Sequence, residues 1–146
     1  MKRHPALAHL SSDHHDALRL ARSLQDASRD GESAAKRALQ RLAEQWRGEL
    51  LGHFAWEERW FGRLLGDAPE AAQLLAEHWA LRQHIEALVD GKVDRHIGDR
   101  LGHVGALLQA HVRWEERVLM PVVERAASDT DLAQMQHSTK HPPSAY

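Results

Sequence analysis

The sequence predicts an all-α protein, folded as an antiparallel, up-down-up-down four-helix bundle. Three observations predict this fold. Glycine and proline are scarce, at 9 and 5 of 146 residues, while Ala, Leu, Arg, Glu and Gln outnumber Val and Ile, and this composition favours helices. Apolar residues recur at steps of three and four along four segments. Short loops join these segments, and short connections place successive helices antiparallel to one another.

The first two helices are bounded by helix-breaking residues. The first is expected over about residues 5–29, because Pro5 suits a first helical turn and Arg29-Asp30-Gly31 ends the segment. The second starts near Ser33 and stops at Gly66-Asp67-Ala68-Pro69, a loop with two breakers. The first helix carries an apolar stripe of Leu7, Leu10, Ala17, Ala21 and Leu24, and the second one of Leu39, Leu42, Trp46, Leu50, Trp56, Trp60 and Leu64.

The third helix is expected over about 70–89 and the fourth over about 94–127. Pro121 falls inside the fourth, so we expect a kink or a break near it. A short polar turn of helix is expected from Asp129. Residues 1–137 are predicted to form a single domain, and residues 138–146 a loose carboxy-terminal tail. Glycines within the second and fourth helices indicate close helix–helix approach or, alternatively, room beside His53 or His103; they are Gly48, Gly52, Gly62, Gly98, Gly102 and Gly105.

The composition excludes several classes of protein. The net charge is −2, which argues against a nucleic-acid partner, since nucleic-acid-binding proteins show a basic face. The absence of cysteine excludes disulfides, thiolate metal sites and iron–sulfur clusters. The amino terminus lacks the apolar region of a signal peptide, and no stretch approaches the ~20 apolar residues of a membrane span. We therefore expect a cytoplasmic protein with no membrane partner. The oligomeric state is left open.

Histidine is the unusual feature of the composition, at 12 of 146 residues. Two of the histidines begin an internal repeat, in which His53-Phe-Ala-Trp-Glu-Glu-Arg matches His111-Val-Arg-Trp-Glu-Glu-Arg, 58 residues later. In each copy a glutamate, Glu57 or Glu115, follows the histidine by four residues, so both side chains lie on one face of a helix. That face is the apolar stripe. A buried imidazole and a buried carboxylate are costly unless they share a cation.

The first and third helices each add a histidine to their apolar stripe. His78 lies among Leu74, Leu81 and Ile85. In the first helix His14 fits the apolar register, but its neighbour His15 is a rival, because His15-x-x-Leu-Arg matches His78-x-x-Leu-Arg. We favour His14. The six side chains predicted to converge on a metal site in the bundle core are His14, His53, Glu57, His78, His111 and Glu115.

Imidazole and carboxylate ligands without sulfur suit iron, manganese or zinc. The chain contains no Glu-x-x-His sequence, which is the ligand pattern of ferritin-like di-iron bundles. Glu58 and Glu116, which follow the two inward glutamates, step off the stripe and are expected to support the ligands or lie at the surface. Tryptophans at 56, 60, 79 and 114 are expected to shield the site from water.

At this point the sequence resembles the hemerythrin-like, or HHE cation-binding, domain family. The resemblance rests on Leu10-x-x-Asp13-His14, on His53-Phe54-x-x-Glu57-Glu58, on Glu77-His78-x-x-Leu81 and on His111-x-x-x-Glu115-Glu116-x-x-Leu119-x-Pro121. It implies a non-haem di-iron centre with an oxo or hydroxo bridge. It also implies that the four histidines are terminal ligands and that Glu57 and Glu115 bridge the two irons.

The chain departs from the family's oxygen carriers at one position. Those proteins place a second histidine four residues along the third helix, where this chain has Arg82. A water, His15, His84 or another side chain would fill the gap. The loss weighs against reversible oxygen carriage and favours sensing, redox or metal-handling roles.

We therefore predict a di-iron protein, with manganese or zinc as alternatives, that binds dioxygen or a related small ligand for sensing, storage or protection. Two alternatives stay open. One is redox or iron-handling chemistry, such as nitric oxide or peroxide reduction or iron–sulfur repair. The other is a structural module stapled by metal. Whether the protein is an enzyme is left undecided.

Overall fold

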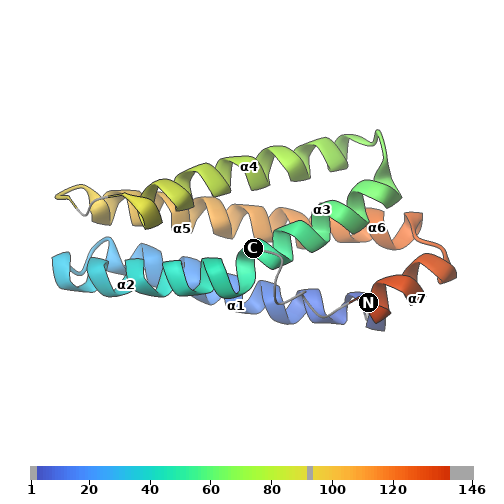
Figure 1. The fold of residues 1–146 in the computed structure, drawn as a ribbon, viewed down its shortest axis with the longest axis horizontal. Helices are drawn as coiled ribbons and strands as arrows, with labels where there is room; N and C mark the ends of the chain where they lie inside the picture. Colours follow the sequence, from blue (N-terminus) through green and yellow to red (C-terminus); the bar gives the residue numbers. More distant parts are fainter. Residues whose placement is uncertain (1–2, 92–93, 139–146) are drawn as a thin grey trace.

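The computed structural model describes residues 3–91 and 94–138, and in these ranges all regular structure is helical (Figure 1). Four long helical runs lie antiparallel to their neighbours in the chain, as predicted. The first is a 3₁₀ turn, Pro5–Leu7, with α1, Ala8–Ala27; the third is α4, Pro69–Asp90. The second consists of α2, Glu32–Gln45, the π-helical segment η2, Trp46–Leu50, and α3, Leu51–Leu65. The fourth consists of α5, Ile97–Trp114, the π-helical η3, Glu115–Leu119, and α6, Met120–Ala126.

The two π-helical segments are features that periodicity did not predict. At η2 the second run changes direction, so that α3 leaves the line of α2 (Figure 1). The fourth run does not break at Pro121, which lies in the first turn of α6. The wider turns of η3 come just before it and include Arg117, the residue whose carbonyl would meet the proline ring in a regular helix. The local disturbance expected at Pro121 is thus a π segment rather than a break.

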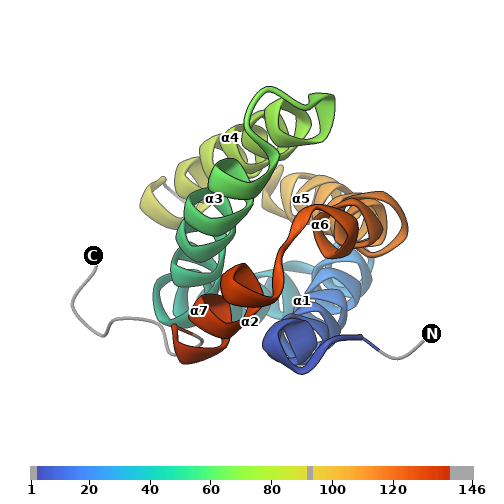
Figure 2. The same ribbon diagram turned by 90° about the vertical axis from the view of Figure 1, so that its right-hand side faces the viewer.

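A short helix closes one end of the bundle. α7, Asp129–His137, begins at Ser128 with a capping box completed by Asp131. It packs against the 3₁₀ turn at the start of the first run, and Figure 2 shows it across the end of the bundle. Of the predicted tail, residues 138–146, all but Ser138 lie outside the described residues.

The core consists of two apolar clusters. One gathers side chains from α1, α2, α4 and α5, among them Leu24, Leu42 and Ile85; the other lies towards α6 and α7 and includes Leu10, Phe61 and Met135. Gly105 lets α5 approach α1 closely, because a Cβ there would lie 2.6 Å from the carbonyl oxygen of Ala21. Close helix approach is therefore the reading that fits Gly105.

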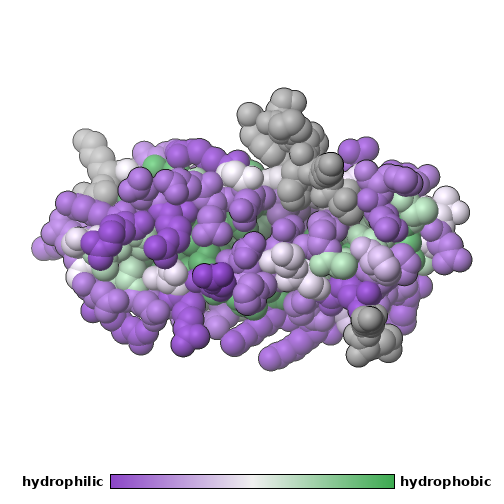
Figure 3. All heavy atoms as spheres, turned by 90° about the horizontal axis from the view of Figure 1, so that it is seen from below, coloured by the Kyte–Doolittle hydropathy of each residue, from purple (hydrophilic) through white to green (hydrophobic). Residues whose placement is uncertain are grey.

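Polar side chains dominate the face drawn in Figure 3, with apolar ones visible between them. In the described part of the chain, no helix has both the length and the apolar character to cross a membrane.

Candidate metal centre

The six predicted ligand residues come together between the two apolar clusters. Each is buried, with at most 5% of its surface exposed. α1 supplies His14, α3 supplies His53 and Glu57, and α4 supplies His78. His111 comes from α5 and Glu115 is the first residue of η3. His15 is exposed on the other side of α1, so it is His14 that lies in this cluster. Their role as metal ligands stays a prediction.

The six residues form two overlapping groups. His14 and His53 make one group with both glutamates, and His78 and His111 make the other with the same two glutamates. Within each group one ligand atom from every residue lies within 4.8 Å of the others. Two overlapping His₂Glu₂ groups are consistent with a binuclear metal site.

Each glutamate divides its two oxygens between the groups. Glu57 places Oε2 3.1 Å from the Nε2 of His53 and Oε1 3.2 Å from the Nε2 of His78. Glu115 places Oε2 2.7 Å from the Nε2 of His14 and Oε1 2.6 Å from the Nε2 of His111. A carboxylate in this position can bridge two cations, one on each oxygen.

The donor atoms fit a cation better than they fit one another. All four oxygens of the two glutamates, and the Nε2 atoms of His14, His78 and His111, are buried and make no hydrogen bond. Buried polar atoms without hydrogen bonds cost free energy. Their short separations without hydrogen-bond geometry are those of ligands directed towards a common point, so the residues fit a pair of metal ions.

Without a cation, protons on the histidines compensate the negative charge of the buried glutamates. Burial opposes protonation of His14, but Glu115, Glu116 and Glu57 outweigh it and raise its pKa to about 12. Burial likewise opposes protonation of His53, while Glu57 and Asp13 raise its pKa to about 9. The pKa of His78 is raised well above its usual value, and that of His111 is also raised. Four imidazolium protons carry the same charge as two divalent cations.

A second layer of carboxylates surrounds the cluster and holds the outer nitrogen of every histidine. An oxygen lies within 3.4 Å of each Nδ1, and three of the four contacts are hydrogen bonds. A carboxylate on Nδ1 fixes the tautomer that presents Nε2 to a metal. The pairs are Asp13 with His53 (3.0 Å), Glu58 with His78 (3.0 Å), Glu77 with His111 (2.7 Å) and Glu116 with His14 (3.4 Å).

These four contacts form a closed ring around the bundle. Each supporting acid is the sequence neighbour of an inward residue on its own helix, and it reaches a histidine on the next helix. The order runs from α1 to α3, from α3 to α4, from α4 to α5, and from η3 back to α1. The supporting role expected for Glu58 and Glu116 agrees with this geometry. Asp13 and Glu77 were not assigned a role from the sequence, although their position beside His14 and His78 was the available signal.

Two arginines hold the ring from outside. The Nη2 of Arg82 lies 3.4 Å from Glu58 Oε2, and Arg3 pairs with Glu116. Arg82 thus pairs with the acid that supports His78, and it does not replace the missing histidine. The two histidines considered for that gap do not fill it either: His15 and His84 are exposed, and His84 packs edge-on against His103 with ring centroids 5.0 Å apart.

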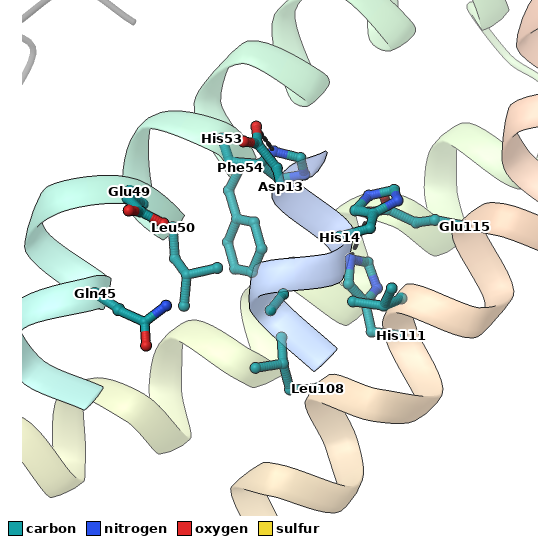
Figure 4. Close-up of a pocket in the computed structure, with 12 residues that line it drawn as sticks. Asp13, His14, Gln45, Glu49, Leu50, His53, Phe54, Leu108, His111 and Glu115 are labelled. Carbon is teal, nitrogen blue, oxygen red and sulfur yellow. Dashed lines mark hydrogen bonds and ion pairs between the residues drawn. The ribbon is translucent and has the colours of Figure 1, made fainter. Parts of the chain in front are cut away.

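A small cavity adjoins the His14/His53 side of the cluster (Figure 4). Its volume of about 20 Å³ suits one water-sized molecule. Apolar side chains line much of it, including Leu50, Leu108 and Val112. Phe54 also lines the cavity, and its ring stacks on His78, with centroids 3.9 Å and planes 11° apart.

The four tryptophans do not all lie beside the site as expected. Trp56 and Trp60 are buried, each 6% exposed, and the ring of Trp114 lies 6.1 Å from that of His111. Trp79 does not shield the site, because it is 63% exposed on the outer face of α4. The sequence reasoning was wrong for Trp79, which follows the inward His78 and therefore points about 100° away from it.

Comparison with known proteins gives one match. The family model described as the hemerythrin HHE cation binding domain matches residues 6–99, more than half of the chain. The matched range includes His14, His53, Glu57 and His78. His111 and Glu115 lie beyond it, and the structure places them in the same cluster. Searches of curated proteins and of solved structures found no match.

Proposed function

The chain belongs to the hemerythrin HHE cation-binding domain family, and from this premise we propose that it holds two iron ions and binds dioxygen or a related small ligand. The observation that carries the proposal is the division of the oxygens of Glu57 and Glu115 between two pairs of histidines. Manganese and zinc share the preference for nitrogen and oxygen ligands. Iron is proposed over zinc because zinc has no redox chemistry, and over manganese because the family resemblance implies a di-iron centre.

An iron pair would supply two adjacent centres that can exchange electrons with a bound ligand. The chain's own residues would do the rest. The two glutamates offset part of the cationic charge, and the carboxylate ring keeps each Nε2 directed inward. The apolar side chains beside the cavity exclude bulk water, which favours a small neutral ligand over a hydrated one.

Each proposed ion would receive two imidazoles and two carboxylate oxygens from the chain. Iron commonly takes more ligands than four, so each position would keep room for an exogenous group. This supports a second candidate function, the reduction of nitric oxide or peroxide or the handling of iron. Turnover of either substrate by the iron-loaded protein would favour that function, and reversible binding without turnover would favour the first.

The test is metal content measured by elemental mass spectrometry on aerobically purified protein, with its near-ultraviolet and visible spectrum. We expect two irons per chain and oxo-bridge absorption that changes with oxygen. His14→Ala should lower the iron content, while His15→Ala, on the adjacent exposed residue, should leave it unchanged. Protein that contains no metal, or one zinc, would overturn the proposal. An iron-loaded form that binds no small ligand would also overturn it.

A further inference from the structure

We propose that Gln45 and Glu49 form the neck of an access path from solvent to the His14/His53 side of the centre, and that this neck passes small neutral ligands faster than anions. The inference rests on the proposed function, because it concerns the ligand of the same site. It adds the route of that ligand, its chemical class and the residues that select it.

Two hollows meet at these two residues. The inner one is the cavity of about 20 Å³ beside His14 and His53. The outer one is a cleft of about 440 Å³ between α1 and α2. Gln45 and Glu49 are the two residues that line both. The boundary between the cleft and the cavity therefore lies at these two side chains.

The local helix geometry places both side chains at this boundary. Gln45 is the last residue of α2 and Glu49 lies within the π segment η2, where the turn is wider than in an α-helix. Gln45 is half-buried and Glu49 is exposed. Figure 4 shows Leu50 and Phe54 following them inward, between the neck and the histidines. The neck thus leads from polar side chains to apolar ones within two turns of helix.

The cavity does not reach His78. Phe54 stacks directly on His78, which is 0% exposed. The cavity, by contrast, touches His14, His53, His111 and Glu115. Of the two pairs of histidines, the His14/His53 pair is therefore the one that a ligand would meet through the neck.

The charges along the path favour a neutral ligand. In the outer cleft Arg19 and Arg41 balance Asp16 and Glu49. The inner lining contains three carboxylates, those of Asp13, Glu49 and Glu115, and no lysine or arginine in the described residues. Asp13 is hydrogen-bonded to His53 and Glu115 would hold metal, so Glu49 is the carboxylate that an anion meets as it loses water in the neck, and its passage is slowed. A neutral diatomic molecule meets no such barrier.

The experiment compares rates of association with the iron-loaded full chain by stopped-flow spectroscopy. Azide, measured at pH 8, is the anionic probe, and nitric oxide is the neutral one. Glu49→Gln removes the charge with little change of shape. We expect it to speed azide association about fivefold, which is the effect of one nearby unit charge in water. Nitric oxide association should be unchanged. Glu44→Gln, on an exposed residue of α2 that lines neither hollow, is the matched control and should change neither rate.

A second variant tests the path itself. Gln45→Trp fills the neck, and we expect it to slow both ligands at least tenfold while the iron content stays at the wild-type level. Unchanged rates for both ligands in Gln45→Trp, or an unchanged azide rate in Glu49→Gln, would overturn the neck while leaving ligand binding intact. Iron-loaded wild-type protein that binds neither probe would instead refute the proposed function, and the neck with it.

Discussion

The two halves of the candidate centre have the same ligand chemistry and different surroundings. The His14/His53 half and the His78/His111 half share both glutamates, and every histidine has a carboxylate beside its Nδ1. The cavity touches both histidines of the first half, but of the second it touches His111 and not His78, which Phe54 covers. The internal repeat accounts for part of this. Its common residues supply four of the six predicted ligands, and one of its two differing positions holds Phe54 in one copy and Val112 in the other. Both side chains line the cavity, but it is Phe54 that stacks on His78. Ligand chemistry and the cover over His78 are therefore set by different residues of the same repeat.

Glu115→Ala should have the largest effect, because it removes an oxygen from both halves at once. We expect the chain to lose both proposed metal ions. His111→Ala, one turn earlier, takes a ligand from one half only and should leave about one ion per chain. Elemental mass spectrometry of the purified variants measures this difference. Equal metal contents in the two variants would show that Glu115 does not bridge.

Phe54→Ala should make the two halves alike. Deletion of this buried ring, which is 1% exposed, should lower the free energy of unfolding by about 3–5 kcal/mol. It should also open the His78 side to ligand, so that nitric oxide binds in two kinetic phases rather than one. Chemical denaturation measures the first effect and stopped-flow spectroscopy the second. Val112→Ala, at the matching position of the repeat, is the control and should keep a single phase.

Glu77→Gln tests the carboxylate ring in the His78/His111 half. Loss of the charged acceptor on His111 Nδ1 should weaken metal binding by about 10- to 100-fold. Asp13→Asn should do the same in the His14/His53 half through His53. Competition with a chelator measures both affinities, and Glu86→Gln, at a half-buried residue further along α4, serves as the control. If Glu77→Gln and Asp13→Asn bound metal as tightly as the wild type, the ring would have no role in metal binding.

Proton release gives the smallest expected signal. Metal uptake by the metal-free protein near pH 7 should release up to four protons, because all four histidines have raised pKa values. Calorimetry in buffers of different ionisation enthalpy counts them. A histidine with a raised pKa stabilises the metal-free fold fully below pH 6.5, its unfolded value. His53 should therefore lose its contribution as the pH rises through about 9. Uptake without proton release would show that the imidazoles are neutral before metal binds.

Periodicity was sufficient for much of the fold. The third helix was expected over about 70–89 and spans Pro69–Asp90. The apolar register also favoured His14 over His15, and the exposure of His15 agrees with that choice. These inferences depend on one face of a regular helix, which the spacing of apolar residues defines directly.

The π segments were missed because periodicity assumes 3.6 residues per turn. Buried residues follow one another at steps of four through Leu42, Trp46, Leu50 and Phe54, and each such step over-rotates a regular helix by about 40°. A π segment, with its wider turns, compensates for this accumulated rotation. The same signal, uninterrupted steps of four, runs from His111 through Glu115, Leu119 and Val123. The cavity could not be predicted at all, because it depends on how three separate runs pack together.

The carboxylate ring also selects the rotation of each helix about its own axis. An apolar stripe of Leu and Ala tolerates a small rotation, since one aliphatic side chain can replace another in a core. A pair such as Asp13-His14 does not, because one residue must point inward while its neighbour reaches the adjacent helix. A rotation by one residue would break two contacts of the ring at once. Among relatives of this chain, each supporting acid and the inward residue beside it in the sequence should therefore change together or not at all.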